Sequence, residues 1–232
     1  MKILVTGCGR GGTNLGIELV RAFDAFNTTK EVEDRTFFAK KTLPPDYATK
    51  LATENTGFTI ENIDRKMKEN PDLVIIFMVR HPLDICLSKI LRGRPQSEGG
   101  DSTVEQTAAD GTPLGAMMVI KHMNTIYNFL QETYPSRLLT IKLEDLTTDT
   151  RAEVNRVAAF LGVDPTEKTF NFHQNNRNRY QKARYGDKLH PQVDLYKDLE
   201  NNFEGIFRSK GDEVKKIGAL LKNLISDLGY IL

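Results

Sequence analysis

A run of large apolar side chains over residues 73–79, with the sequence LVIIFMV, constrains the fold of this chain more than any other segment. Pro71-Asp72 precedes the run and Arg80-His81-Pro82 follows it, so turn-forming residues bound it on both sides. Neighbouring side chains of a strand point to opposite faces, and a run that is apolar throughout therefore needs cover on both faces. The pattern is typical of a central parallel strand that lies between two layers of helices.

The rest of the chain alternates between strand and helix patterns. Further strands are predicted at 2–6, 35–40 and 138–143, and helices at 13–26, 60–69, 83–91, 117–133, 151–161 and 212–228. The helix at 151–161 is expected to end at Gly162, a residue that favours helix C-termini. This alternation predicts an α/β fold with a mainly parallel central sheet, flanked by helices and joined by right-handed crossovers.

The segment 93–115 differs from the rest, since it is rich in Gly, Ser, Thr, Asp and Gln and nearly free of large apolar residues. We expect a mobile surface loop here, and loops of this length are usually functional or disordered. With 232 residues, 39% of them hydrophobic and 27% charged, the chain is long enough to form one domain over residues 1–232 with its own core.

The composition argues against several classes of protein. A net charge of +1 gives no field that attracts nucleic acid. The two cysteines, Cys8 and Cys86, indicate neither a disulfide framework nor a zinc site, and no metal is expected because the four histidines lack ligand spacing. No run approaches the roughly 20 apolar residues of a membrane span, and the first apolar run is too short for a signal peptide. A cytoplasmic protein is expected.

A glycine-rich segment, residues 7–14 with the sequence GCGRGGTN, joins the first predicted strand to the first helix. Glycines allow a tight turn in which backbone N–H groups and the helix N-terminus approach an anion. Gly7, Gly9 and Gly12 also satisfy the dinucleotide fingerprint GxGxxG, which is a weak signal alone. Three interpretations stay open here: a phosphate cradle, a dinucleotide site, and a turn that binds nothing.

Two nucleotide-binding classes fit this segment poorly. A dinucleotide enzyme needs an acidic residue at the end of its second strand, whereas the second predicted strand runs into Lys40-Lys41. In addition, Arg10 places a cation inside the loop, in a position that suits a group being transferred. A nucleotide kinase needs a lysine immediately before the helix hydroxyl, and here Gly12 precedes Thr13.

A second motif, residues 80–88 with the sequence RHPLDICLS, follows the central strand. Ligands of open α/β sheets bind at the carboxyl ends of the strands, so Arg80 is expected at the same edge as the glycine segment. Ser88 lies about two turns along the next helix, and an arginine fork with a hydroxyl suits a terminal phosphate. The alternative is that Arg80 only pairs with a local carboxylate such as Asp84.

Taken together, the motifs resemble the sulfotransferases that use 3′-phosphoadenosine 5′-phosphosulfate. The resemblance covers nearly the whole chain and depends on motif order: Arg10 with Gly12-Thr13, Arg80 with Ser88, Glu144-Asp145-Leu146 with Phe160-Leu161-Gly162, and Leu228-Gly229-Tyr230. It implies a P-loop-like sulfotransferase architecture. Leu143 precedes Glu144 where many animal phenol and steroid members have Tyr, and Thr42-Leu43-Pro44 lacks their catalytic histidine. The chain is therefore more similar to bacterial and carbohydrate-type members.

The resemblance also implies roles for single residues. The cofactor would be 3′-phosphoadenosine 5′-phosphosulfate, and the acceptor a hydroxyl or amine of a carbohydrate, lipid or small molecule. Arg80 and Ser88 would bind the 3′-phosphate, Lys41 would lie with Arg10 near the reacting sulfate, and Arg184, with Lys182 and Gly186, would close over the cofactor. A solvated basic stretch is the alternative at Arg184. The phosphosulfate would be wrapped by Gly9, Arg10, Gly11, Gly12, Thr13 and Asn14.

The general base is left open among Glu31, Glu33, Glu54 and His122. Two other functions stay open as well. One is a catalytically silent nucleotide-binding module of the same fold, and the other is an NAD(P)-dependent oxidoreductase with a Rossmann fold.

Overall fold

The computed structural model describes residues 1–28, 36–55, 57–86 and 113–173, together with Ala219, Lys222, Asn223, Ser226 and Leu228. Its described strands form one sheet in the order β2-β3-β1-β4-β5, and every pair of neighbours is parallel. The strands are β1 (Lys2–Gly7), β2 (Asn27–Thr28), β3 (Tyr47–Lys50), β4 (Leu73–Val79) and β5 (Leu138–Lys142). The prediction of an α/β fold with a mainly parallel sheet is confirmed.

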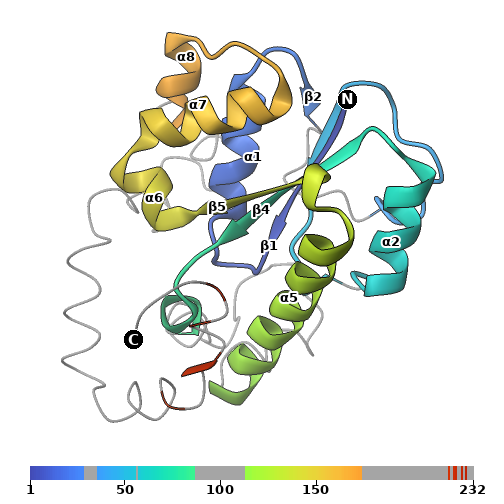
Figure 1. Cartoon of the computed structure of the whole chain (residues 1–232), viewed down its shortest axis with the longest axis vertical. Helices are drawn as coiled ribbons and strands as arrows, with labels where there is room; N and C mark the ends of the chain where they lie inside the picture. Colours follow the sequence, from blue (N-terminus) through green and yellow to red (C-terminus); the bar gives the residue numbers. More distant parts are fainter. Residues whose placement is uncertain are drawn as a thin grey trace, which may run out of the picture.

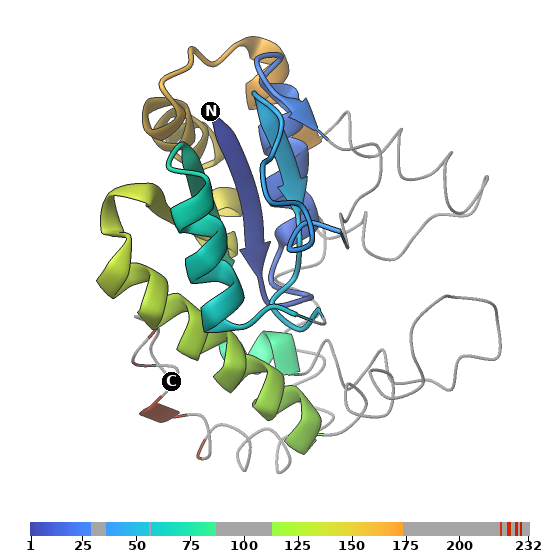
Figure 2. The same ribbon diagram turned by 90° about the vertical axis from the view of Figure 1, so that its right-hand side faces the viewer.

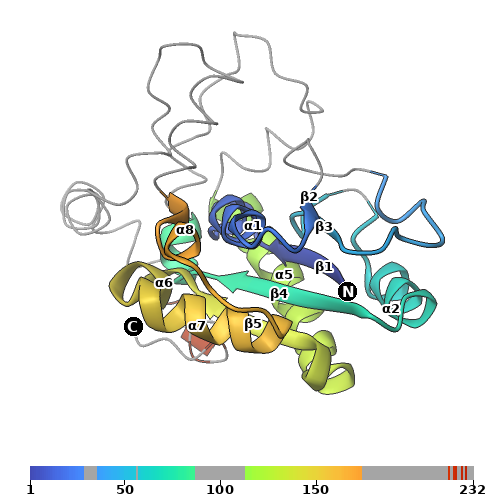
Figure 3. The same ribbon diagram turned by 90° about the horizontal axis from the view of Figure 1, so that it is seen from above.

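The central strand β4 is covered on both faces, as its apolar run predicts. Leu73, Ile75, Phe77 and Val79 belong to the core shared with α2 (Ile60–Glu69) and α5 (Pro113–Thr133). Ile76 and Met78 belong to the core shared with α1 (Thr13–Ala22) and α7 (Thr150–Leu161). Figure 1 shows α1, α6, α7 and α8 on one side of the sheet and α2 and α5 on the other, and the two layers can be followed in Figure 2 and Figure 3.

Local signals set the ends of several helices. The Thr59 hydroxyl accepts a hydrogen bond from the Asn62 backbone N–H at 3.2 Å and caps α2. The Asp149 carboxylate caps α7 in the same way, through the Ala152 N–H at 3.0 Å. Helix α7 ends at Gly162, which adopts a left-handed conformation with φ 65°, as predicted. The shorter helices are α6 (Leu143–Thr148), α8 (Glu167–Phe170) and the 3-10 helix η1 (Pro135–Arg137).

The predicted strand at 35–40 is wrong over the residues that the structure describes. Residues 36–39 form a turn, and the strand beside β1 is instead β3. The reason is the adjacent pair Phe37 and Phe38, whose rings pack edge to face at 5.1 Å. Phe37 is buried in the α2 face of the core, and a turn allows its neighbour Phe38 to pack against the same core. Successive residues of a strand would point to opposite faces.

The predicted loop at 93–115 is wrong over its last three residues, because helix α5 begins at Pro113. A proline fits the first turn of a helix, where its missing N–H would have no helical partner. The helix predicted at 83–91 is observed over 82–86. The rest of that predicted helix and the predicted loop up to residue 112 lie outside the described residues. The same holds for most of the helix predicted at 212–228. Within the described part of the chain, no helix is both long enough and apolar enough to span a membrane.

Candidate active site

The glycine segment follows β1 and lies at the carboxyl edge of the sheet. Gly12 precedes α1 and adopts a left-handed conformation with φ 93°, and no side chain of the described residues caps this helix. The N–H groups of the first turn therefore remain available to an anion. Arg10 has φ 75°, which is uncommon for a residue with a side chain and is often found at functional sites.

Two of the glycines lie in close contact with neighbouring residues, and the contact at Gly7 requires a glycine. A Cβ atom at Gly7 would overlap the backbone carbonyl of Met78 on the neighbouring strand β4. A Cβ atom at Gly9 would overlap the carboxylate of Glu54. The glycine segment is therefore tightly packed between the strand ends on either side of β1.

Arg80 follows β4, and its side chain reaches the glycine segment. It is 8% exposed, and its Nη1 donates a hydrogen bond to the backbone carbonyl of Arg10 at 3.3 Å. Its Nε lies 3.7 Å from Oδ2 of Asp84. A guanidinium has five N–H donors, and among the described residues only the one to Arg10 makes a hydrogen bond. Arg80 therefore pairs with Asp84, as the alternative interpretation expected, and it also contacts the glycine segment. It keeps donors that could bind an anion, so its role at a phosphate stays a prediction.

Two carboxyl groups, those of Asp84 and Glu144, lie close to the Arg80 side chain. Asp84 is 4% exposed, and its Oδ1 has no hydrogen-bond partner in the described part of the protein. Burial raises the pKa of Asp84 to about 7; Arg80 opposes this rise and the Glu144 carboxylate adds to it. Glu144, in the first turn of α6, accepts a hydrogen bond from the backbone N–H of His81 at 2.8 Å. The motif Glu144-Asp145-Leu146 thus connects the end of β5 to the end of β4.

The segment after β3 supplies two further side chains. Thr53 donates its backbone N–H to the carbonyl of Gly7 at 3.0 Å, which brings Glu54 to the glycine segment. The Glu54 carboxylate then accepts a hydrogen bond from the Gly9 N–H at 2.8 Å. On β3 itself, Nζ of Lys50 donates to Oδ1 of Asn14 in the first turn of α1 at 2.9 Å. The sequence did not indicate Lys50, because β3 is short and its residues 47–50, YATK, give no apolar run.

Among the candidate bases, Glu54 is the described residue that contacts the glycine segment. His122 is exposed on α5, and its Nε2 lies 2.9 Å from the backbone carbonyl oxygen of Phe58. A carbonyl oxygen only accepts hydrogen bonds, so Nε2 is the donor in this contact and His122 is held away from the glycine segment by residues of another loop. The other predicted site residues that fall outside the described ranges are Glu31, Glu33, Ser88, Lys182, Arg184 and Gly186.

Lys41 is not brought to the glycine segment, which corrects the prediction for this residue. Its backbone carbonyl accepts a hydrogen bond from the side chain of Asn70, 3.3 Å away at the C-terminal end of α2. That end of α2 leads into β4 and therefore lies at the amino edge of the sheet, opposite Arg10. The two edges are separated by the six residues of β1, or about 20 Å at roughly 3.3 Å per residue. The buried lysine Lys66 anchors this turn through the carbonyl of Lys40.

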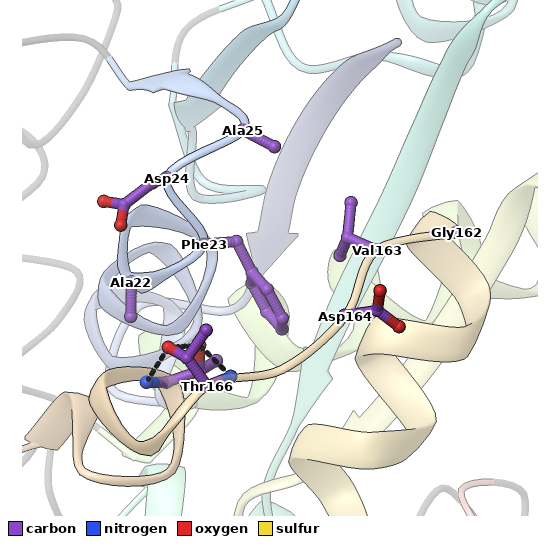
Figure 4. A pocket seen from close by; sticks show the side chains of 9 residues that line it. Ala22, Phe23, Asp24, Ala25, Gly162, Val163, Asp164 and Thr166 are labelled. Carbon is purple, nitrogen blue, oxygen red and sulfur yellow. Dashed lines mark hydrogen bonds between the residues drawn. The ribbon is translucent and has the colours of Figure 1, made fainter.

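A cavity of about 340 Å³ lies at the far edge of the sheet, between the end of α1 and the segment that joins α7 to α8 (Figure 4). It is lined by Ala22, Phe23, Asp24, Ala25, Gly162, Val163, Asp164, Thr166 and Thr169. Because α1 begins at the glycine segment and ends at the cavity, the cavity does not belong to the candidate site. The described residues also contain no group of three or more His, Cys, Asp or Glu that could hold a metal ion.

The strand order argues against a dinucleotide enzyme. Rossmann sheets have the order 3-2-1-4-5-6, whereas this sheet has the order 2-3-1-4-5. The argument from Lys40-Lys41 used the wrong strand, because the strand beside β1 is β3 and Glu54 follows it. The class therefore follows from the topology: a parallel α/β protein with a glycine turn and a buried arginine at one edge of its sheet.

The comparison with family models identifies the family. The model described as the Sulfotransferase family matches residues 35–167, more than half of the chain, so the protein belongs to the sulfotransferase family. The resemblance predicted from the motifs is confirmed at this level. No curated protein matches the sequence.

Solved structures support the fold. The mouse sulfotransferase SULT7A1 complexed with PAP is 18% identical, with a TM-score of 0.50 over 72% of this chain, and the match spans 60% of the length of the mouse chain. The sulfotransferase domain of the Synechococcus PCC 7002 olefin synthase is 14% identical, with a TM-score of 0.54 over 86% of this chain and 88% of that one. At these identities the likeness concerns the fold alone.

Proposed function

We propose that this protein transfers the sulfuryl group of 3′-phosphoadenosine 5′-phosphosulfate to a hydroxyl or amine of a carbohydrate, lipid or small-molecule acceptor. The observation that carries the proposal is the hydrogen bond from the Arg80 guanidinium to the Arg10 carbonyl at 3.3 Å. It brings the two arginines of the family motifs to one edge of the sheet, and each is suited to one of the two phosphorylated ends of the nucleotide.

The residues at this edge fit such a ligand. The uncapped first turn of α1 and the Arg10 side chain suit the 5′-phosphosulfate, with Gly9, Gly11, Gly12, Thr13 and Asn14 lining the turn. Arg80 is buried and keeps donors for the 3′-phosphate, the group that distinguishes this nucleotide from ATP. Ser88 and Arg184 take part by resemblance to the family.

Sulfuryl transfer needs an in-line approach and stabilisation of negative charge on the leaving phosphate oxygen. Arg10 and the N–H groups of the first turn of α1 supply this stabilisation. Lys50 takes the place that the sequence predicted for Lys41, because its ammonium hydrogen bonds to Asn14 in that turn.

Glu54 is the proposed general base. It is a carboxylate at the rim of the loop, where the Gly9 N–H at 2.8 Å fixes its orientation. A base at this position lies beside the Arg10 segment, near the proposed position of the reacting sulfate. The acceptor proton would pass to the Glu54 carboxylate as the acceptor oxygen or nitrogen attacks.

Thermal-shift titration tests the ligand. A ligand that binds only the native state raises stability by RT ln(1 + [L]/Kd), so adenosine 3′,5′-bisphosphate should raise the Tm at lower concentrations than ATP or NAD. Stabilisation by NAD without stabilisation by the bisphosphate would contradict the proposal. Transfer of radiolabelled sulfate to a panel of acceptors then tests the chemistry. Bisphosphate binding without transfer to any acceptor would favour the silent nucleotide-binding module.

A further inference from the structure

The carboxyl groups of Asp84 and Glu144 near Arg80 support an inference that rests on the proposed function and extends it. We propose that Asp84 couples binding of the 3′-phosphate to the uptake of one proton by exchanging partners. In the free protein its carboxylate is the counter-ion of Arg80. When the 3′-phosphate takes that place, Asp84 becomes a neutral acid with a proton taken up from solvent.

The free protein shows a loose and replaceable ion pair. The closest approach between Arg80 and Asp84 is 3.7 Å, from Nε to Oδ2, and the two residues form no hydrogen bond. Both side chains are buried, and the other carboxylate oxygen of Asp84 has no partner among the described residues. A tight pair would hold the guanidinium with two parallel hydrogen bonds. This pair leaves those donors available.

The charges around Asp84 explain why an arriving anion changes its protonation. The groups that face it are the guanidinium of Arg80 and, from α6, the carboxylate of Glu144, with the imidazole of His81 nearby in the chain. Glu144 is already engaged by the His81 backbone N–H. With both acids ionised this buried corner has one positive and two negative charges, and a phosphate at Arg80 adds more negative charge. Repulsion in a poorly solvated site then favours protonation of Asp84.

Protonation is accessible because burial already brings the pKa of Asp84 to about 7. A further rise of this pKa on nucleotide binding makes Asp84 take up a proton in the neutral pH range. A nucleotide whose binding is coupled to such proton uptake binds more tightly at lower pH. Adenosine 5′-phosphosulfate lacks the 3′-phosphate and leaves the Arg80–Asp84 pair in place. Its affinity should therefore not depend on Asp84.

Titration calorimetry in two buffers of different ionisation enthalpy measures this proton uptake. At about pH 7.5, a rise of about one unit in the pKa of Asp84 gives about half a proton more per bisphosphate in the wild type than in Asp84→Asn. Subtracting the proton uptake of the variant from that of the wild type removes the protons that the phosphate itself and other groups take up. His81→Gln serves as the matched control and should keep the difference from Asp84→Asn. At about pH 8.5, Asp84→Asn should bind the bisphosphate several-fold more tightly than the wild type does, whereas loss of a merely structural residue would weaken binding.

The outcomes separate this inference from the proposed function. If the wild type does not bind the bisphosphate at all, the proposed function fails, and the inference fails with it. If it binds but wild type and Asp84→Asn take up equal numbers of protons, only the inference is overturned. Equal Asp84-dependent uptake with adenosine 5′-phosphosulfate overturns the coupling between the 3′-phosphate and the proton. Should Asp84→Asn not fold, infrared difference spectra of the wild type decide, because the inference requires a protonated carboxyl band that appears on bisphosphate binding.

Discussion

The guanidinium of Arg80 donates a hydrogen bond to the backbone carbonyl of Arg10, 3.3 Å away, although the two residues lie 70 positions apart in the sequence. The contact joins the ends of β4 and β1, which are neighbours in the sheet. Two guanidinium groups with different surroundings therefore lie at one edge of the sheet. Arg10 belongs to the turn itself, whereas Arg80 follows β4 and hydrogen bonds to the turn. Substitutions of the two arginines are therefore expected to have different effects.

Replacement of Arg80 should weaken nucleotide binding. We expect Arg80→Ala to raise the Kd of adenosine 3′,5′-bisphosphate by about a hundredfold, because truncation of one partner of a buried charge pair costs about 2–5 kcal/mol. Arg80→Lys should recover only part of the loss, since an ammonium does not reproduce the guanidinium fork. Calorimetry measures both values, and Arg65→Ala, on the exposed face of α2, is the control. Equal Kd values for Arg80→Ala and wild type would remove Arg80 from the site.

Replacement of Arg10 should act on turnover. Loss of one preorganised donor to a developing negative charge costs about a hundredfold to a thousandfold in kcat, and Arg10→Ala should fall in this range. The folded protein should remain, because the Arg10 side chain is only partly buried. Steady-state kinetics with the best acceptor of the panel gives the measurement, and the exposed Arg151→Ala is the matched control. A kcat within a few-fold of wild type would contradict the role of Arg10.

Glu54→Gln distinguishes a base from a residue that only shapes the loop. The amide can still accept the hydrogen bond from Gly9, so bisphosphate affinity should be kept or increased as a negative charge is lost. Turnover should fall by about a hundredfold to ten-thousandfold, the usual contribution of a general base. His122→Gln, on α5, should change kcat little. If Glu54→Gln keeps its turnover, the base is elsewhere in the chain.

The two lysines provide a direct comparison between the sequence-based prediction and the structure. Lys50→Met keeps most of the buried volume on β3 but removes the ammonium that hydrogen bonds to Asn14. We expect it to lower kcat by at least about tenfold, as loss of an electrostatic contact near the reacting group does. Lys41→Met, at the amino edge of the sheet, should stay close to wild type. The reverse result would support the sequence-based assignment.

Asp84 should also make stability depend on pH. Its pKa is about 7 in the folded protein, compared with an ordinary value of 3.8, so the folded state binds more protons between these values. This contribution is therefore fully present below about pH 4 and is lost as the pH rises through about 7, with an upper limit of about 4 kcal/mol. Urea denaturation at several pH values, compared with Asp84→Asn, measures it. Identical pH profiles of the two proteins would show that the carboxyl is not perturbed.

Features that depend on local sequence were predicted well. The apolar run of β4, the amphipathic pattern of α2 and the stop of α7 at Gly162 each depend on residues within one segment. Strand β3 was missed for the opposite reason: it has only four residues, and its burial comes from pairing with β1 and from the helices that cover it. The miss also affected the site: Lys41 was assigned by resemblance to the family, whereas the lysine that contacts the first turn of α1, Lys50, lies on the strand that was missed.

The candidate site shows the same division. The glycine segment and Arg80 were recognised from their motifs, since each motif contains its own chemical signal. Glu54 was one of several candidates, and its contact with Gly9 spans 45 positions of sequence. The altered protonation of Asp84 has no sequence signal at all, because it results from burial between Arg80 and the Glu144 carboxylate.

The glycine turn contacts residues that follow three different strands. Glu54 follows β3, Arg80 follows β4, and Leu143, whose side chain lies against Gly12, follows β5. Such a turn is complete only when every one of these strands has joined the sheet. A chain with its β5 edge detached would lose one wall of the turn, so nucleotide capture reports on full assembly. Hydrogen exchange should accordingly slow on ligand addition as far away as α6, and not only in the turn itself.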